Sequence, residues 1–135
     1  MKISISTQGH NDIINLTPEI EKLVKKSGVK EGMVYLFVTG STAALTTLEY
    51  ESGLIEDLQM VLEKIVPEGV DYKHHQRWSD HNGAAHLRAA LMKPDLIIPI
   101  ENGELTLGTW QQVVLIDFDE RPRTREIIIK VSKVD

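Results

Sequence analysis

The chain has 135 residues, of which 41% are hydrophobic, and its 15 basic and 20 acidic residues give a formal net charge of −5. This length predicts one domain, residues 1–135, and the acidic balance argues against a nucleic-acid-binding protein, which normally needs a basic surface. The chain contains no cysteine, which excludes disulfides and thiolate nucleophiles and leaves His, Asp and Glu as the strong metal ligands.

The N-terminal part of the chain predicts a strand followed by a helix. Residues 1–8 alternate apolar with polar side chains, which is the two-residue period of a half-buried strand. Thr17 and Pro18 predict a helix start, with a hydroxyl cap and a first-turn proline, and Gly28 marks the helix end. No segment here is apolar enough for a signal peptide or membrane anchor, so we expect a soluble, cytoplasmic protein that does not engage membranes.

The middle of the chain predicts two strands and the main helix. Residues 33–38 are an apolar run typical of a buried strand, and residues 44–50 are expected to form another after a turn at 40–42. Apolar side chains recur at helical spacing over residues 52–66. Residues 67–81 are polar and irregular, and a loop of this length in a small domain is more often functional than idle.

The C-terminal part predicts a short helix and a hairpin. Residues 82–92 are rich in alanine and are expected to form the helix. Asn102 and Gly103 supply the positive φ angles of a type I′ turn, so residues 95–101 and 105–110 are expected to pair as strands.

Two last strands complete the expected fold. Residues 112–118 and 125–134 are expected to form a further antiparallel pair. Strands that pair with their neighbours in the sequence, together with few helices, indicate an α+β fold. We therefore predict a compact single domain of mainly antiparallel β-sheet packed with two or three helices, whose last four strands form a meander.

Four polar residues form the main candidate site: His74, Asp80, Asn82 and His86. Asn82 and His86 are four positions apart, which places both on one face of a helix. The preceding loop can fold His74 and Asp80 over the N-terminus of that helix, where unpaired N–H groups favour anions. We interpret these residues as the centre of a pocket.

Two chemistries suit this pocket. His74, His86 and Asp80 offer two nitrogen ligands and one oxygen ligand with one position open, which resembles a catalytic site for zinc or a similar divalent ion. Alternatively, one imidazole acts as a general acid–base group and Asp80 orients its ring. The non-functional alternative is that the histidines are solvated and that Asp80 or Asn82 only caps the helix.

The turn at Gly40 is a second candidate, for binding phosphate. Ser41 and Thr42 can offer N–H and O–H donors there, although an ordinary connection has the same composition. Glu49, on the following strand, is a candidate carboxylate for the same pocket. The three arginines of residues 121–125 are either a solvated turn or a docking point for a phosphate or a neighbouring subunit.

The remaining polar and aromatic residues receive simpler interpretations. His75 or His81 can replace a neighbouring ligand, whereas His10 is expected only to be exposed. Arg88 is expected at a surface or interface, and Trp110 as a packing anchor.

Five segments of the chain, in order, resemble motifs of the YjbQ-like family. The resemblance is carried by residues 40–49, 71–74 (DYKH), 78–83 (WSDHNG), 86–89 (HLRA) and 105–112 (LTLGTWQQ). It extends over nearly the whole chain. Members of this family are described as secondary thiamine-phosphate synthase enzymes, and many are uncharacterised.

The resemblance implies an α+β domain that assembles as a homotrimer. It also implies a pocket formed by the histidine motif, often with a bound divalent metal such as zinc or magnesium. The family's recurrent polar positions and its recurrent carboxylate fall on His74, Asp80, Asn82, His86 and Glu49. Many relatives carry a histidine where Gly40 and Ala84 stand, so a metal here has fewer ligands to draw on.

The activity implied is a transferase reaction that joins a pyrimidine pyrophosphate to a thiazole phosphate with loss of pyrophosphate. The charge that grows on the departing pyrophosphate needs a divalent ion or cationic groups. The first alternative is a non-catalytic homotrimer that binds a metal or a small phosphorylated metabolite. The second is an interaction protein with an incidental pocket.

Overall fold

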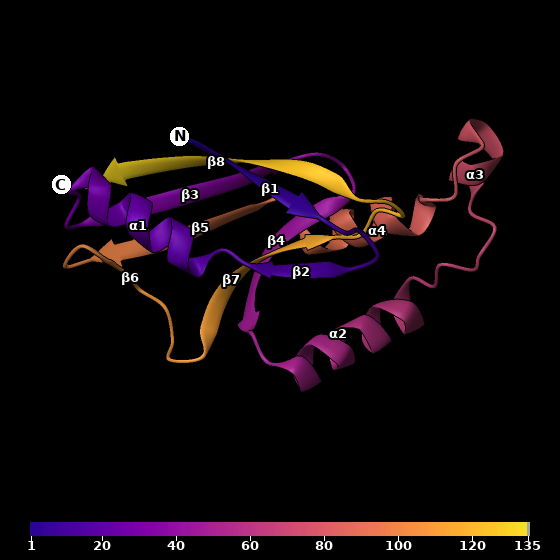
Figure 1. Cartoon of the computed structure of the whole chain (residues 1–135), viewed down its shortest axis with the longest axis horizontal. Coiled ribbons are helices and arrows are strands. Elements are labelled where there is room, and N and C mark those ends of the chain that lie inside the picture. The colour runs from indigo at the N-terminus through magenta and orange to yellow at the C-terminus, as the bar shows by residue number, and fades with distance from the viewer. Residues whose placement is uncertain (135) are drawn as a thin grey trace.

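The computed structural model describes residues 1–134, which form eight strands and four helices. In chain order these are β1 (Lys2–Thr7), β2 (Asp12–Asn15), α1 (Thr17–Ser27), β3 (Gly32–Thr39), β4 (Ala43–Glu49), α2 (Ser52–Ile65), α3 (Lys73–Trp78), α4 (Gly83–Met92), β5 (Asp95–Glu101), β6 (Glu104–Leu105), β7 (Gln111–Asp117) and β8 (Arg123–Lys133). The predicted α+β class is confirmed, with four helices in the described residues in place of two or three (Figure 1). No helix within residues 1–134 has both the length and the apolar character needed to cross a bilayer.

The strands form two antiparallel sheets. The larger has the order β1-β8-β3-β5-β6 and the smaller the order β2-β7-β4. The expected pairing of residues 112–118 with 125–134 is therefore wrong, because β7 lies in the smaller sheet and β8 in the larger. The last four strands are not a meander for the same reason. The turn between β7 and β8 crosses from one sheet to the other, and this crossing positions the polar cluster described below.

The strand β7 explains why the two sheets pack as they do. Val113 and Leu115 belong to one hydrophobic cluster, whereas Val114 and Ile116 belong to a second on the opposite face. Because side chains alternate along a strand, an unbroken apolar run is buried on both faces. Each fully buried side chain of this size contributes about 1.5–3 kcal/mol.

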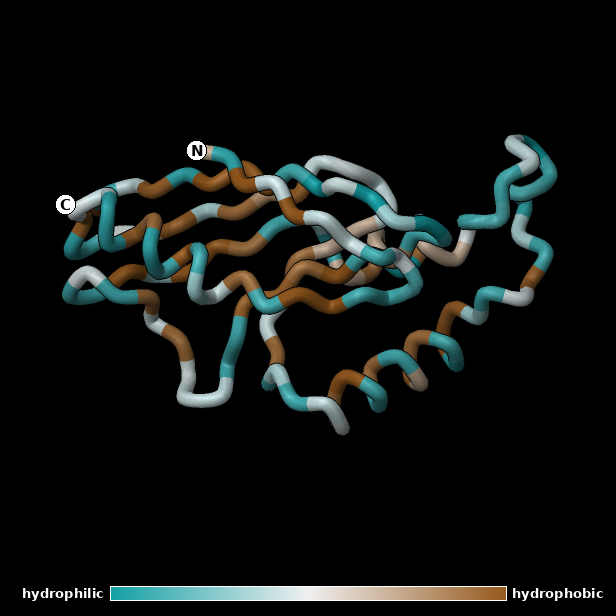
Figure 2. The backbone as a smooth tube through the Cα atoms, in the orientation of Figure 1, coloured by the Kyte–Doolittle hydropathy of each residue, from teal (hydrophilic) through white to brown (hydrophobic). Residues whose placement is uncertain are grey.

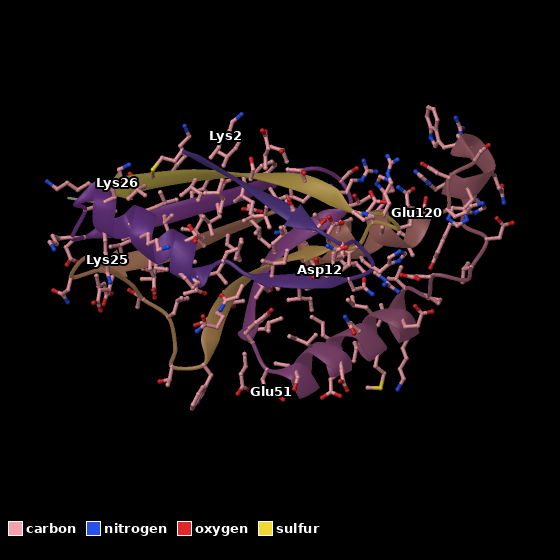
Figure 3. The ribbon with its side chains drawn as sticks, viewed as in Figure 1. Lys2, Asp12, Lys25, Lys26, Glu51 and Glu120 are labelled. Atoms are coloured by element: carbon pink, nitrogen blue, oxygen red, sulfur yellow. The ribbon has the colours of Figure 1, made fainter. Side chains whose placement is uncertain are left out.

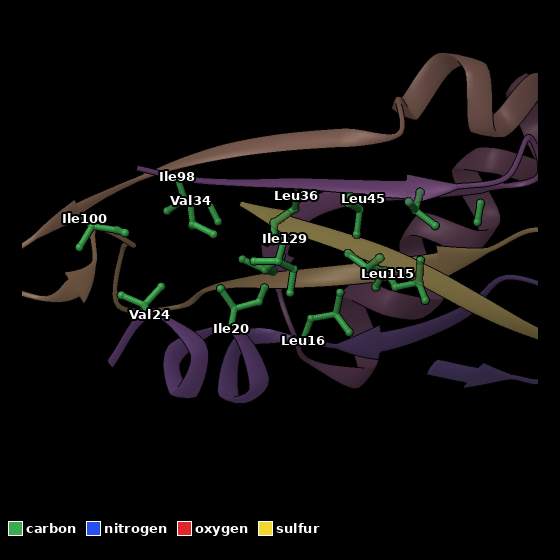
Figure 4. Packing of buried hydrophobic residues seen from close by; sticks show 14 residues of the cluster. Leu16, Ile20, Val24, Val34, Leu36, Leu45, Ile98, Ile100, Leu115 and Ile129 are labelled. Carbon is green, nitrogen blue, oxygen red and sulfur yellow. The ribbon is translucent and has the colours of Figure 1, made fainter. Parts of the chain in front are cut away.

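The first cluster lies between α1 and the strands of both sheets (Figure 4). Ile20 and Val24 come from α1, and Leu36 and Ile129 from the larger sheet. In the second cluster, the opposite face of the smaller sheet packs against α2 and α4, through residues such as Leu62. Hydropathy follows this division, since apolar segments concentrate in the strands while the segment that holds α3 is largely hydrophilic (Figure 2).

The structure differs from the sequence-based expectation at the start of α1, in residues 67–81 and in residues 106–110. Thr17 is the first helical residue of α1 instead of its cap, and its hydroxyl oxygen accepts a hydrogen bond from the Val113 backbone N–H at 2.8 Å. Gly28 ends the helix with φ 73°, as expected. The expected loop at 67–81 contains the short helix α3, and residues 106–110 are irregular where a strand was expected.

Candidate functional site

The helices α3 and α4 bring two predicted histidines together at one end of the molecule (Figure 1). His74 lies on α3 and His86 on α4, and their ring centroids are 4.6 Å apart with the planes tilted by 41°. Both rings are partly buried. Because the two imidazoles lie this close together, a ligand that binds one of them will also interact with the other.

Asp80 adjoins this pair, as expected. Its Oδ1 atom is 3.4 Å from Nδ1 of His74. The contact lacks hydrogen-bond geometry, and both buried atoms are left without a hydrogen-bond partner. Buried polar atoms normally have partners, because an unpaired one costs about 1–3 kcal/mol. This pair of atoms is therefore free to bind a ligand or to close on each other.

His75 holds the two helices in place. Its Nε2 atom accepts a hydrogen bond from the backbone N–H of Gly83, the first residue of α4, at 3.2 Å. A Cβ at position 83 would lie 3.1 Å from that nitrogen and from the Tyr72 side chain, so this close approach favours glycine. His81 packs on His75 with ring centroids 5.0 Å apart. His75 on α3 thus links that helix to the first residue of α4 by a hydrogen bond.

The surroundings of His86 set its protonation. Burial lowers the pKa of His86 below its ordinary value, and the nearby imidazole of His74 lowers it further. The carboxylates of Asp119 and Asp80 oppose these effects without cancelling them. At neutral pH His86 is therefore mainly uncharged and can accept a proton.

The turn at Gly40 reaches the same site. Gly40 and Ser41 line a cavity of about 240 Å³ together with His86 and Pro94. Ser41 is exposed, so its hydroxyl is available to a ligand. The hydroxyl of Thr42 is not, because it donates to Asp119 Oδ2 at 2.9 Å and accepts from Arg125 Nη2 at 2.6 Å. Of the two hydroxyl groups expected to contact a phosphate, only that of Ser41 is available.

A buried ionic cluster lies behind this turn, and its members were not foreseen as such. Arg125 is 7% exposed and donates from Nε and Nη2 to the carboxylate of Asp117, both at 2.7 Å. Arg123 pairs with Asp119 at 2.9 Å. The proposed phosphate dock at 121–125 is therefore wrong for these two arginines, because carboxylates already neutralise both of them.

The two aspartates are held ionised by this cluster. Burial alone would raise the pKa of Asp117, but hydrogen bonds from Arg125 and Thr7 bring it below its ordinary value. Burial likewise opposes ionisation of Asp119, and hydrogen bonds from the Glu120 backbone N–H and from Thr42 overcome that effect and lower its pKa. The cluster thereby fixes the turn that carries Ser41.

Glu49 does not join the histidines within one chain. It ends β4, six residues beyond Ala43, and a strand rises about 3.3 Å per residue, so it lies roughly 20 Å from the Gly40 turn. It lines a separate hollow of about 410 Å³ with Trp110. Trp110 is 72% exposed, which makes the expectation of a packing anchor wrong.

The comparisons with known proteins agree over almost the whole chain. The model of the family described as UPF0047 protein YjbQ-like matches residues 1–134. The chain belongs to this YjbQ-like family. A UPF0047 protein of Archaeoglobus fulgidus is 38% identical over 96% of this chain and 98% of its own length. One from Synechocystis is 40% identical over 95% of this chain and 87% of its own.

Solved structures of YjbQ-like proteins have the same fold. A YbjQ-like protein of unknown function from Sulfolobus solfataricus has a TM-score of 0.93 and 31% identity, over 99% of this chain and 96% of its own. An uncharacterised conserved protein of the family from Clostridium acetobutylicum has a TM-score of 0.89 and 35% identity, over 98% and 99%. These relatives establish the family and the fold, and neither is named for an activity.

The metal ligands expected for a YjbQ-like pocket are only partly assembled. His74, Asp80 and His86 are the residues that would hold a divalent ion, and the unpartnered atoms of the first two suit that role. However, within residues 1–134 no three His, Asp or Glu side chains converge as a metal site. At Gly40, an added Cβ would lie 2.8 Å from the Arg125 guanidinium. The site is therefore better suited to imidazole chemistry than to a three-ligand metal centre.

Arg88 lies in the interior of the chain, where the sequence did not predict it. It was expected at the surface, yet it is 1% exposed and bonds the Val66 carbonyl from Nε and Nη2 at 3.0 and 2.8 Å. It also pairs with Glu63 and Glu68. An arginine within an alanine-rich helix was the only available signal, and it did not reveal these distant partners.

Proposed function

We propose that this YjbQ-like chain is an enzyme that acts on a small phosphorylated metabolite at His74 and His86. The observation that carries the proposal is the close imidazole pair beside the open turn at Ser41. His86 is mainly uncharged at neutral pH because its pKa is lowered, so its ring can form hydrogen bonds to a bound substrate. His74 is suited to donate an N–H to a phosphate oxygen, and Asp80 would orient its ring if the 3.4 Å contact between them closed to a hydrogen bond.

Formation of thiamine phosphate is the reaction that we propose for this pocket. The thiazole nitrogen would attack the methylene carbon of the pyrimidine pyrophosphate, the carbon–oxygen bond would break, and pyrophosphate would leave with the bonding electrons. Imidazole N–H groups of His74 and His86 would stabilise the departing oxygen, and the step itself transfers no proton. A divalent ion, when bound, would supply the same stabilisation more strongly.

The proposal also includes the assembly and location implied by the family resemblance. We propose a cytoplasmic homotrimer, and the assembly can be checked by the mass of the purified protein in solution. A divalent ion such as zinc or magnesium is a further part of the proposal, and it would have to be held by as few as two side chains, His74 and Asp80, whose buried atoms have no other partner within residues 1–134. Elemental analysis of the same sample tests this directly.

A binding function without catalysis is the second candidate. The observation in its favour is that Arg123 and Arg125 are already paired, which leaves little free positive charge for a departing pyrophosphate. In that case the protein would bind a metal or a phosphorylated metabolite and release it unchanged.

One experiment separates the two candidates. Purified protein is incubated with the pyrimidine pyrophosphate and the thiazole phosphate, with and without magnesium or zinc, and the coupled product is measured by mass spectrometry. Product above the protein-free control supports the enzyme. A rise in thermal stability with each precursor but no product supports the binding protein. If the protein shows neither product nor a rise in thermal stability, both candidates are contradicted.

A further inference from the structure

A second cavity lies beside the N-terminal half of α4, and its lining includes Asn82, one of the four residues predicted for the imidazole pocket, but neither His74 nor His86. Its volume is about 220 Å³. Two alanines of α4 and the ring of Phe118 form the apolar part of its wall. Its polar lining consists of His10, Glu68, His81, Asn82 and Glu120. Glu120 lies near α4 at the same end of the molecule as α3 (Figure 3).

Buried Arg88 braces three segments that border this cavity. Its Nη1 atom donates to Asn11 Oδ1 at 2.9 Å and pairs with Glu68 Oε1 at 3.3 Å. It also bonds the Val66 carbonyl, just before Glu68. Arg88 itself lies on α4, so one side chain fixes the turn near His10, the segment after α2, and the helix. A wall held in this way is pre-organised, which reduces the cost of ordering it when a ligand binds.

The turn that presents His10 is held in a strained conformation. Gly9, His10 and Asn11 all have positive φ angles, of 73°, 52° and 64°. Glycine adopts such an angle freely, whereas at His10 and Asn11 it costs about 1–3 kcal/mol each. The turn persists because the His10 backbone N–H donates to the Asp119 carbonyl at 2.7 Å and Arg88 holds the Asn11 amide. Strain that surrounding contacts maintain is typical of binding sites.

Asn82 is the residue that points to a missing ligand. It is 8% exposed, and its buried Oδ1 atom has no hydrogen-bond partner. It does not cap α4, although it precedes the helix. A buried amide oxygen without a partner costs about 1–3 kcal/mol, which a ligand with a hydrogen-bond donor would recover.

The charge of the lining indicates what kind of ligand would fit. Glu68 is offset by Arg88, whereas Glu120 is exposed and has no ion-pair partner among the described residues. The cavity therefore presents a free carboxylate and an amide oxygen above an apolar wall. We propose that it binds a small organic cation that donates hydrogen bonds, such as an amidinium or a primary ammonium on a flat apolar body. This proposal does not depend on the reaction at His74 and His86.

The test uses three probes of similar shape and different charge: benzamidine, benzamide and benzoate. Each is titrated into the full-length protein labelled with nitrogen-15, and backbone amide shifts are followed by NMR. We expect benzamidine to shift the amides of His10, Asn82 and Glu120 in a saturable way, at concentrations where benzoate does not. Equal binding of benzamidine and benzoate, or saturable shifts confined to other parts of the chain, would overturn the proposal.

Two variants sharpen the result. Glu120→Gln should weaken benzamidine binding about two- to fivefold, the usual effect of losing one exposed charge pair. Asn82→Ala should weaken both benzamidine and benzamide, by roughly two- to tenfold, because it removes a hydrogen bond. Glu126→Gln, an exposed carboxylate elsewhere, serves as the matched control and should change nothing. Unchanged affinity in both cavity variants, with their spectra still those of a folded chain, would overturn the proposal.

Discussion

Arg125 and Asp117 form a buried two-point ion pair, with Nε and Nη2 of the guanidinium each 2.7 Å from a carboxylate oxygen. The pair joins β8 of the larger sheet to the end of β7 in the smaller one. Through Thr42 it also holds the turn that presents Ser41.

We expect Arg125→Met to lower the free energy of unfolding by about 3–5 kcal/mol, because it leaves a buried carboxylate unpaired. Urea unfolding measures this, and exposed Arg121→Met is the control. A loss below about 1 kcal/mol would mean that the pair does not hold the sheets together.

The same cluster makes stability depend on acid. Asp117 and Asp119 have pKa values below the ordinary 3.8 in the folded chain. The unfolded chain therefore binds protons more readily, so this stability is full above about pH 3.8 and lost as pH falls through the folded values. Asp117→Asn should be less stable at pH 7 and lose less on acidification. Unfolding curves between pH 2.5 and 7 check this, and the same slope in both proteins would contradict it.

Arg88 should matter less for stability than its complete burial suggests. Its carboxylate partners Glu63 and Glu68 are about half exposed, so they can be solvated when the guanidinium is removed. The main loss is the pairing of the Val66 carbonyl. We expect Arg88→Met to cost about 1–3 kcal/mol by urea unfolding. A loss of stability larger than that of Arg125→Met would contradict this, because it would show that Glu63 and Glu68 need the Arg88 guanidinium despite their exposure to solvent.

His86 should titrate below the ordinary imidazole value of 6.5. Protonation is disfavoured in the folded chain, so this histidine's contribution to stability is full above about pH 6.5 and declines as pH falls through the folded pKa. His74→Gln should raise the pKa of His86, because it removes a neighbouring group whose charge lowers that pKa. NMR titration of the ring nitrogens measures both values, with Gln76→Ala on α3 as the control. A midpoint at or above 6.5 would contradict the environment described for His86.

Local patterns in the sequence predicted the parts of the fold that depend on neighbouring residues. The helix ending at Gly28 and the turn at Asn102 and Gly103, with φ 54° and 82°, follow from local chemistry. The assignment of β7 and β8 to different sheets does not, because an apolar run buried on both faces reads like any other strand. Pairing of strands is settled by packing across the whole chain.

The site shows the same division. The proximity of His74, Asp80 and His86 was predictable, since they lie within thirteen residues and helical spacing limits their positions. The roles of the arginines were not. Arg125 bonds a residue 83 positions away and Arg88 one 77 positions away. No local pattern reports such partners, and an arginine paired in the interior has the same sequence signature as a free one.

We propose above that His86 takes part directly in the reaction at the imidazole pair. The most direct test is the rate of coupled product from both precursors with wild-type protein and with His86→Gln, each shown to be folded. We expect product from the wild type and a loss of at least about a hundredfold in the variant, the usual effect of removing one group that stabilises a developing negative charge. Gln76→Ala should retain the full rate. Equal rates for the wild type and His86→Gln would contradict the claim.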